Sequence, residues 1–269
     1  MPDLNLLTNI AIKASLIAGK EIIEVYKSSD FKITSKSDDT PLTLADRKAH
    51  DVIIGMLAET NLPVLSEEGA VIPYEERKEW TYFWLVDPLD GTKEFINRNG
   101  EFTVNIALIY KNSPILGVIY VPVTKDLYFG NKDIGAFKAI NVDSGLQFEN
   151  LESLLQMSFR LPFFIDDEVI TVVASKSHLT KETSDYIEEL KKTNDNINIV
   201  SKGSSLKICM VAEGTATIYP RFGPTMEWDI AAGHAIALAA GCQVTLKDEK
   251  TPLEYNKEEL LNPWFMVKR

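Results

Sequence analysis

The sequence predicts a layered protein in which an antiparallel-sheet half is followed by an α/β half. Between Glu101 and Ile140, short apolar strands follow one another with only turns between them, which is typical of an antiparallel meander. From Val169 to Leu246, apolar strands alternate with helices, which is typical of an α/β layer. We therefore expect a first domain over residues 1–150 and a second over 151–269, divided within the weakly patterned stretch 141–167.

The composition is that of a globular protein and excludes several classes. The chain has 269 residues, of which 45% are hydrophobic and 25% charged, enough for a sizeable core. A formal net charge of −11 argues against a protein that coats nucleic acid. Cys209 and Cys242 lie in apolar segments, so we expect buried thiols without a disulfide partner. Because we find no signal peptide and no apolar run of about 20 residues, we expect a cytoplasmic protein.

Two amphipathic helices are expected near the N-terminus. Apolar residues recur at helical spacing from Leu4 to Val25, and this face most simply covers the core. A helix lying on a membrane surface is the alternative, which leaves open a peripheral position at the cytoplasmic face of the inner membrane. The second helix, Leu44 to Glu59, has Thr43 as a plausible N-cap and Asp46 in its first turn. On its own, Asp46 need only complement the helix dipole.

The remaining elements follow from runs of apolar residues bounded by turn residues. In the first half we expect a short charged helix at 74–80 and strands at 31–37, 63–66, 82–86, 101–110, 114–123, 127–130 and 136–140. In the second half we expect strands at 169–174, 197–200, 216–219 and 243–246, with helices at 180–192, 204–213 and 227–240.

The run from Trp84 to Phe95 carries the clearest chemistry of the chain. The apolar strand should stop at Asp87, because Pro88 has no N–H to donate to a strand partner. The turn that follows brings the Asp87 and Asp90 carboxylates and the Leu89 carbonyl together. Hard divalent cations such as Mg²⁺ prefer such oxygen ligands.

Beside these oxygens, the backbone N–H groups of Gly91 and Thr92 suit a phosphate. A turn that gathers metal and phosphate suggests phosphoryl transfer or hydrolysis. The alternative is an ordinary acidic turn, since Asp, Pro and Gly favour turns for backbone reasons.

Three further clusters lie in the second half. Ser175 to His178 follow a strand end, where α/β sheets often contact ligands. Gly203 to Lys207 open a helix with small residues and one cation, which suits an anion. Asp229 lies in the first turn of an alanine-rich helix, where an Asp is usually a dipole partner or cap. His178 and His234 also have a simpler interpretation, as surface or core residues.

Three segments together resemble a known family. They are Glu67-Glu68 after a strand, Asp87 to Thr92, and Trp228 to Gly233. In order, they resemble the signatures of the lithium-sensitive, magnesium-dependent phosphatases related to inositol monophosphatase. The longer runs 82–109, 203–225 and 260–263 resemble one branch, the bacterial 3′(2′),5′-bisphosphate nucleotidases. The resemblance covers essentially the whole chain and implies an α/β/α/β/α sandwich.

The resemblance also implies roles for individual residues. Glu67, Asp87 and the Leu89 carbonyl would hold one Mg²⁺, and Asp87, Asp90 and Asp229 a second. Glu67 would share a third, more loosely held ion and counts with the catalytic residues.

The other catalytic residues implied by the resemblance are Asp46 and Thr92, which would orient and deprotonate the attacking water. The resemblance places these residues at the substrate: Glu67, Leu89, Asp90, Gly91, Thr92, His178, Ser204, Lys207, Arg221 and Asp229.

The implied activity is magnesium-dependent, lithium-sensitive hydrolysis of the 3′-phosphate of adenosine 3′,5′-bisphosphate. The products would be AMP and phosphate, which clears a by-product of sulfate activation. An inositol monophosphatase is the alternative within the class, and a non-catalytic nucleotide or metal sensor is the alternative outside it. We expect a monomer, with a dimer as the alternative.

Overall fold

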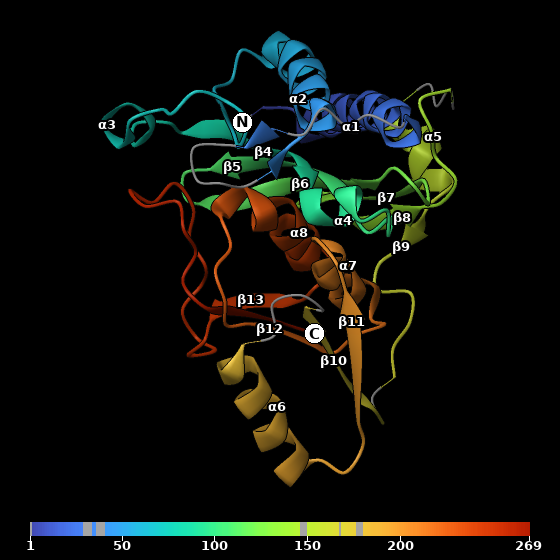
Figure 1. Cartoon of the computed structure of the whole chain (residues 1–269), viewed down its shortest axis with the longest axis vertical. Coiled ribbons are helices and arrows are strands. Elements are labelled where there is room, and N and C mark those ends of the chain that lie inside the picture. Colours follow the sequence, from blue (N-terminus) through green and yellow to red (C-terminus); the bar gives the residue numbers. More distant parts are fainter. Residues whose placement is uncertain (1, 29–33, 36–40, 146–149, 167, 176–179) are drawn as a thin grey trace.

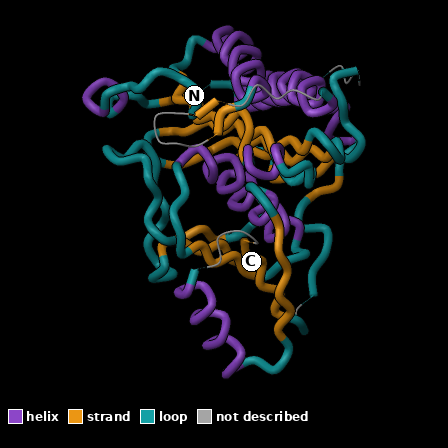
Figure 2. The backbone as a smooth tube through the Cα atoms, viewed as in Figure 1, coloured by secondary structure: helices purple, strands orange, loops and turns teal. Residues whose placement is uncertain are grey.

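The computed structural model describes residues 2–28, 34–35, 41–145, 150–166, 168–175 and 180–269. Helices and sheets alternate in layers, in the order helices, sheet, helices, sheet, helices (Figure 1). The same layering is seen in Figure 2, where helical segments lie above, between and below the strands. This arrangement confirms the layered sandwich expected from the sequence.

Most helices and strands lie close to their predicted positions. The helices are α1 (Leu4–Lys27), α2 (Leu44–Leu57), the 3-10 turn η1 (Ala58–Thr60), α3 (Tyr74–Arg77), α4 (Thr92–Ile96), α5 (Leu151–Gln156), α6 (Lys181–Thr193), α7 (Leu206–Glu213) and α8 (Glu227–Ala239). The strands are β1 (Thr34–Ser35), β2 (Pro41–Leu42), β3 (Val64–Ser66), β4 (Tyr82–Asp90), β5 (Thr103–Tyr110), β6 (Ser113–Val121), β7 (Asp126–Asn131), β8 (Gly135–Ala139), β9 (Phe159–Arg160), β10 (Ile170–Ser175), β11 (Ile197–Lys202), β12 (Ile218–Arg221), β13 (Gln243–Leu246) and β14 (Phe265–Lys268). Of these elements, β2, α5, β9 and β14 were not predicted.

The first sheet has seven strands in the order β3 to β9, and only the pair β3–β4 is parallel. Helices α1 and α2 cover one face, and the buried residues of α1, among them Ala11, Ile12 and Ala18, pack into that core. The last strand, β9, lies beyond residue 150, so the first sheet extends past the predicted division of the chain. The two-domain division itself stays a prediction.

Strand β4 does not stop at Asp87, so this prediction was wrong. The strand continues to Asp90, and its pairing with β5 shifts by one residue between Asp87, opposite Asn105, and Asp90, opposite Thr103. Pro88 lies inside this bulge, where no ladder hydrogen bond requires its missing N–H. The bulge therefore places both carboxylates at the same end of β4.

The second sheet has five strands in the order β11-β10-β12-β14-β13. Strand β10 pairs in parallel with both β11 and β12, as an α/β layer requires. Strand β14 lies antiparallel between β12 and β13 and was missed from the sequence. Its four residues show no alternation, because Phe265, Met266 and Val267 are all buried in the middle of the sheet.

Helix α8 lies between the two sheets (Figure 1). Most of its residues are buried. Its backbone comes unusually close to β6. A Cβ atom built on Gly117 would lie 2.1 Å from the carbonyl oxygen of Ala232. Only glycine allows this close approach. The contact sets the depth at which α8 packs against the first sheet, and with it the position of Asp229 in the first turn of α8.

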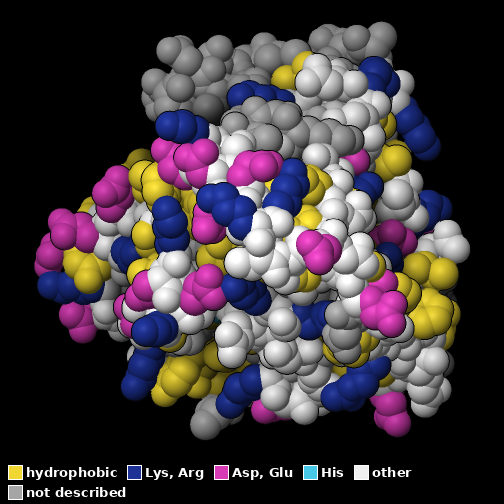
Figure 3. Space-filling model, turned by 90° about the horizontal axis from the view of Figure 1, so that it is seen from below, with side chains coloured by type: hydrophobic (Ala, Val, Ile, Leu, Met, Phe, Trp, Pro, Cys, Tyr) yellow, Lys and Arg dark blue, Asp and Glu magenta, His cyan; other side chains and the backbone are white. Residues whose placement is uncertain are grey.

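The surface and the cysteines agree with the composition. On the face seen from below in Figure 3, Lys and Arg are interspersed with Asp and Glu among the described residues, without a large patch of one sign. Cys209 and Cys242 are buried free thiols, as expected. Within the part of the chain that the structure describes, no helix is long and apolar enough to cross a membrane.

We expect Gly117→Ala to lower the free energy of unfolding by about 1–3 kcal/mol, because the added methyl group would force α8 away from β6. The matched control is Gly55→Ala in α2, where an added Cβ meets nothing within 4 Å. That change should stabilise the protein by roughly 0.5–1 kcal/mol. Chemical denaturation measures both effects. A Gly117→Ala protein as stable as the wild type would contradict the close packing.

Candidate active site

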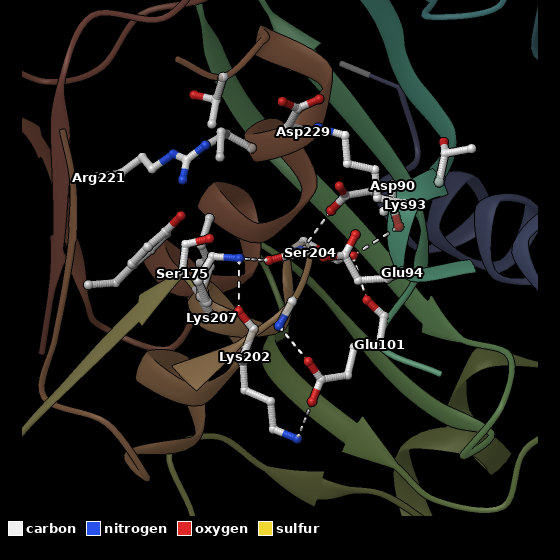
Figure 4. Close-up of a pocket in the computed structure, with 18 of the residues that line it drawn as sticks. Asp90, Lys93, Glu94, Glu101, Ser175, Lys202, Ser204, Lys207, Arg221 and Asp229 are labelled. Atoms are coloured by element: carbon white, nitrogen blue, oxygen red, sulfur yellow. Dashed lines mark hydrogen bonds and ion pairs between the residues drawn. The ribbon is translucent and has the colours of Figure 1, made fainter. Parts of the chain in front are cut away.

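Most of the predicted site residues line a cavity of about 350 Å³ between the two sheets (Figure 4), whereas Asp46, Asp87 and Leu89 are not among its lining residues. Its wall includes residues from β4, α4, the β11–α7 loop, β12 and the start of α8. Among the predicted residues, Glu67, Asp90, Gly91, Thr92, Ser204, Lys207, Arg221 and Asp229 line it. His178 lies outside the described residues.

Three carboxylates form a tight cluster at one end of this cavity. Oxygens of Glu67, Asp87 and Asp229 lie within 4.8 Å of one another. Glu67 follows β3, and its N–H donates to the carbonyl of Val86 at 3.1 Å, so the ends of two parallel strands carry two of the acids. Helix α8 supplies the third acid, Asp229, whose Oδ2 accepts a hydrogen bond from the N–H of Met226 at 2.9 Å. The sequence motifs, far apart along the chain, are thus brought together.

Asp90 lies on the other side of the bulge and is oriented by both halves. Its Oδ2 accepts hydrogen bonds from the N–H of Ser205 at 2.7 Å and from Asn105 Nδ2 at 3.4 Å. Between the two acids, Leu89 N–H donates to Asp87 Oδ1 at 3.1 Å. The turn thereby holds the Asp87 and Asp90 side chains in fixed orientations.

Burial and mutual repulsion raise the pKa values of the three aspartates of the site. Burial, followed by repulsion from the neighbouring carboxylates, raises the pKa of Asp87 and of Asp229 well above the usual range. Burial also raises the pKa of Asp90 to about 6, although Lys207 and the hydrogen bond from Ser205 oppose the shift. Buried oxygen ligands with excess negative charge are the donor set that a hard divalent cation requires, so the residues fit magnesium.

Asp46 and Thr92 meet as the resemblance implied. The Thr92 hydroxyl donates to Asp46 Oδ1 at 3.2 Å, although the two residues are 46 positions apart. The other oxygen, Oδ2, accepts from Thr43 N–H at 2.8 Å in the capping box of α2. Asp46 therefore belongs to the N-terminal capping box of α2, as its position in the helix predicts, and it also contacts the cavity residue Thr92.

The turn between β4 and α4 is locked to the second half. Gly91 has φ of 93°, and a Cβ there would lie 2.2 Å from Ser204 Oγ, so both conformation and space require glycine. Ser204 Oγ donates to the carbonyl of Asp90 at 3.0 Å or that of Glu101 at 2.6 Å. The Glu101 side chain accepts from the N–H of Gly203 at 2.9 Å.

The two predicted cations lie on the wall away from the carboxylate cluster. Lys207 is only 6% exposed, and its Nζ donates to the Ser204 carbonyl at 2.5 Å. Burial lowers the pKa of Lys207 to about 8, so the ammonium form still predominates at pH 7. Arg221 donates to the Pro224 carbonyl at 2.7 Å, while its buried Nε has no hydrogen-bond partner among the described residues.

Sequence reasoning missed several residues of the wall. Lys93, Glu94, Glu101 and Lys202 all line the cavity. Lys93 and Glu94 directly follow the central motif, so a helical turn starting at Thr92 could have indicated them. Glu101 gave no signal, because its contacts come from a loop about one hundred residues away in sequence.

Fold and site together define a metal-dependent phosphatase of a known class. The chain matches the inositol monophosphatase family over residues 3–264, and it belongs to that family. The 3′(2′),5′-bisphosphate nucleotidase CysQ of Salmonella typhimurium is 46% identical over 254 residues, covering 93% of this chain and 94% of the relative. The crystal structure of CysQ from Bacteroides thetaiotaomicron is 54% identical, covers 96% of this chain and 95% of that one, and superimposes with a TM-score of 0.89.

The inositol monophosphatase of Anabaena (Nostoc) sp. PCC 7120 shares the fold at 24% identity, with a TM-score of 0.69 over 99% of this chain and 92% of that one. This likeness confirms the inositol monophosphatase-like sandwich.

Asp87→Asn should stabilise the metal-free protein at alkaline pH. A carboxyl group whose pKa is raised by folding costs stability as the pH rises from its unfolded-state pKa toward its folded-state pKa, and the folded-state pKa of Asp87 lies well above the usual range. Removing one buried charge should raise the free energy of unfolding at pH 8 by at least about 1.4 kcal/mol, the equivalent of one pKa unit. Denaturation in EDTA at pH 5 and pH 8 measures this.

The control is Asp195→Asn, an exposed acid that should change little. Added Mg²⁺ should stabilise the wild type more than Asp87→Asn, because ligand binding to the folded state raises its stability. Destabilisation of Asp87→Asn in EDTA would contradict the repulsion described for this cluster.

Proposed function

We propose that the protein is a magnesium-dependent 3′(2′),5′-bisphosphate nucleotidase. It hydrolyses the 3′-phosphate of adenosine 3′,5′-bisphosphate and gives AMP and phosphate. One observation carries this proposal: a single cavity has a cluster of carboxylates at one end and Lys207 and Arg221 on another wall. The similarity to CysQ nucleotidases at 46% and 54% identity supports the same substrate class.

The carboxylates provide the magnesium ligands of the proposal. Members of the family are in general magnesium-dependent and inhibited by lithium. Glu67, Asp87 and the Leu89 carbonyl would hold one ion, and Asp87, Asp90 and Asp229 a second, with a third near Glu67. When bound, magnesium would neutralise charge on the phosphoryl group and promote ionisation of the attacking water. Asp87, which contributes to both sites, would set the spacing between the ions.

Thr92 and Asp46 would direct the water. Because the Thr92 hydroxyl donates to Asp46, its oxygen is free to accept a hydrogen bond from the nucleophile. The proton would then pass toward the carboxylate of Asp46. The backbone N–H groups of Gly91 and Thr92 at the start of α4 would donate to the scissile phosphate.

Ser204, Lys207 and Arg221 would bind the rest of the nucleotide. A substrate with one phosphate would leave the two cations without a partner, which favours a bisphosphate over inositol monophosphate. The pairing of Asp46 with Thr92 likewise favours an enzyme over a sensor, since binding alone does not need it. A cytoplasmic monomer also belongs to this proposal, with a dimer and a peripheral membrane position as alternatives.

The wild type should release phosphate from adenosine 3′,5′-bisphosphate with Mg²⁺ and not with EDTA. Arg221→Ala and Lys207→Ala should each lower kcat/KM for this substrate by about one to two powers of ten, the value of one charge-assisted contact. Inositol 1-phosphate, if hydrolysed, should be affected little, which makes it the internal control.

Arg221→Ala is the cleaner variant, because Lys207 also holds the Ser204 carbonyl. An equal fall for both substrates would mean that the cations serve folding or general phosphate attraction. The assignment as a nucleotidase would then lose its physical support.

A further inference from the structure

One cation of the cavity differs from the others in its surroundings. Lys202, Lys207 and Arg221 each have a protein acceptor, namely the Glu101 carboxylate or a backbone carbonyl. The side chain of Lys93, an exposed residue of α4, makes no hydrogen bond or ion pair with any described residue, although the Lys93 backbone carbonyl accepts from the N–H of Asn97 at 2.9 Å. An ammonium group is usually solvated by bulk water unless a binding site gives it a partner. Where the Lys93 ammonium group lies in the cavity therefore indicates which ligand it could bind.

Lys93 lies on the side of the cavity where the carboxylates gather. It directly follows Thr92 in the first turn of α4, next to the backbone that faces the scissile phosphate in the proposed function. In Figure 4 its side chain extends from α4 toward Asp229, whereas Lys207 and Arg221 lie on the opposite wall. A ligand bound over the carboxylate cluster would therefore lie on the same side of the cavity as Lys93.

The charge balance of the site gives this ammonium a role, and the argument here rests on the proposed function. Glu67, Asp87, Asp90 and Asp229 together carry four negative charges when ionised. The two more tightly held magnesium ions would only cancel these charges, before the looser third ion near Glu67 enters. A phosphate monoester that enters as a dianion then meets a neutral cluster and needs further positive charge. Among the described cavity residues, Lys93 is the cation without a protein partner.

We propose that Lys93 binds the scissile phosphoryl group, donating a hydrogen bond from Nζ to a non-bridging phosphoryl oxygen. Lys93 stays protonated throughout and forms no covalent bond. Its duty differs from that of Lys207 and Arg221, because it serves the phosphate that every substrate of this site must carry. Loss of Lys93 therefore weakens all phosphate ligands alike, while loss of the other two cations is selective for bisphosphates.

A different role would give a different pattern. If Lys93 were only a counter-ion for the acidic cluster, its removal would tighten Mg²⁺ binding and leave phosphate binding unchanged at saturating Mg²⁺. If it were only a solvated surface lysine, neither would change. Titrating Mg²⁺ and inorganic phosphate separately distinguishes the three cases.

The experiment compares Lys93→Ala, Lys93→Arg and the control Lys13→Ala, an exposed lysine of α1 in the outer helical layer. Isothermal titration calorimetry measures Mg²⁺ binding first, and then inorganic phosphate binding to the magnesium-loaded protein. We expect Lys93→Ala to weaken phosphate binding roughly 10- to 100-fold. Lys93→Arg should recover most of this loss, because it keeps the charge and the donors. Lys13→Ala should match the wild type.

Phosphate binding within twofold of the wild type in Lys93→Ala would overturn the inference. So would a fall in kcat/KM for adenosine 3′,5′-bisphosphate that inositol 1-phosphate or another monophosphate does not share. The proposed function fails separately, if the wild type does not hydrolyse the bisphosphate. A Lys93-dependent phosphate site would then still stand, with another phosphate monoester as its substrate.

Discussion

The crowding of carboxylates at the end of β4, where Asp87 is buried and Glu67 and Asp229 are partly buried, is the constraint on which the site depends. Glu67, Asp87 and Asp229 place oxygens within 4.8 Å of one another, and burial raises the pKa of both aspartates. Such a cluster is unfavourable in a protein interior unless cations compensate it. The fold nevertheless builds it from three separate segments, which is consistent with the proposed metal site.

The two halves of the chain contact each other around this carboxylate cluster. Asp90 of the first sheet accepts from the N–H of Ser205, and Ser204 bonds to carbonyls of the first half. Helix α8, pressed against β6 at Gly117, brings Asp229 from the second half to the cluster. The distance between the carboxylates and the cationic wall is therefore fixed by interior contacts, and a substrate with two phosphates suits such a fixed distance.

Much of the fold could be predicted from the sequence, because strands and helices with a regular pattern of apolar residues form at the positions that the pattern predicts. The bulge at Pro88 could not be predicted from the sequence, because it depends on the pairing of β4 with the partner strand β5. Strand β14 lacked a pattern because both its faces are buried. The motifs indicated Asp87 and Asp229 individually. Lys93 directly follows the central motif and could have been indicated by it, whereas Glu101 could be placed on the cavity wall only from the structure.

The sharing of Asp87 between two cations is the central claim of this account, and crystals soaked in Mn²⁺ test it most directly. Anomalous diffraction locates each manganese ion independently of any model of the site. We expect two manganese peaks per chain that flank the Asp87 carboxylate, about 3.5–4 Å apart, with any third peak at the looser position near Glu67. A single peak, or peaks that Asp87 does not bridge, would contradict it.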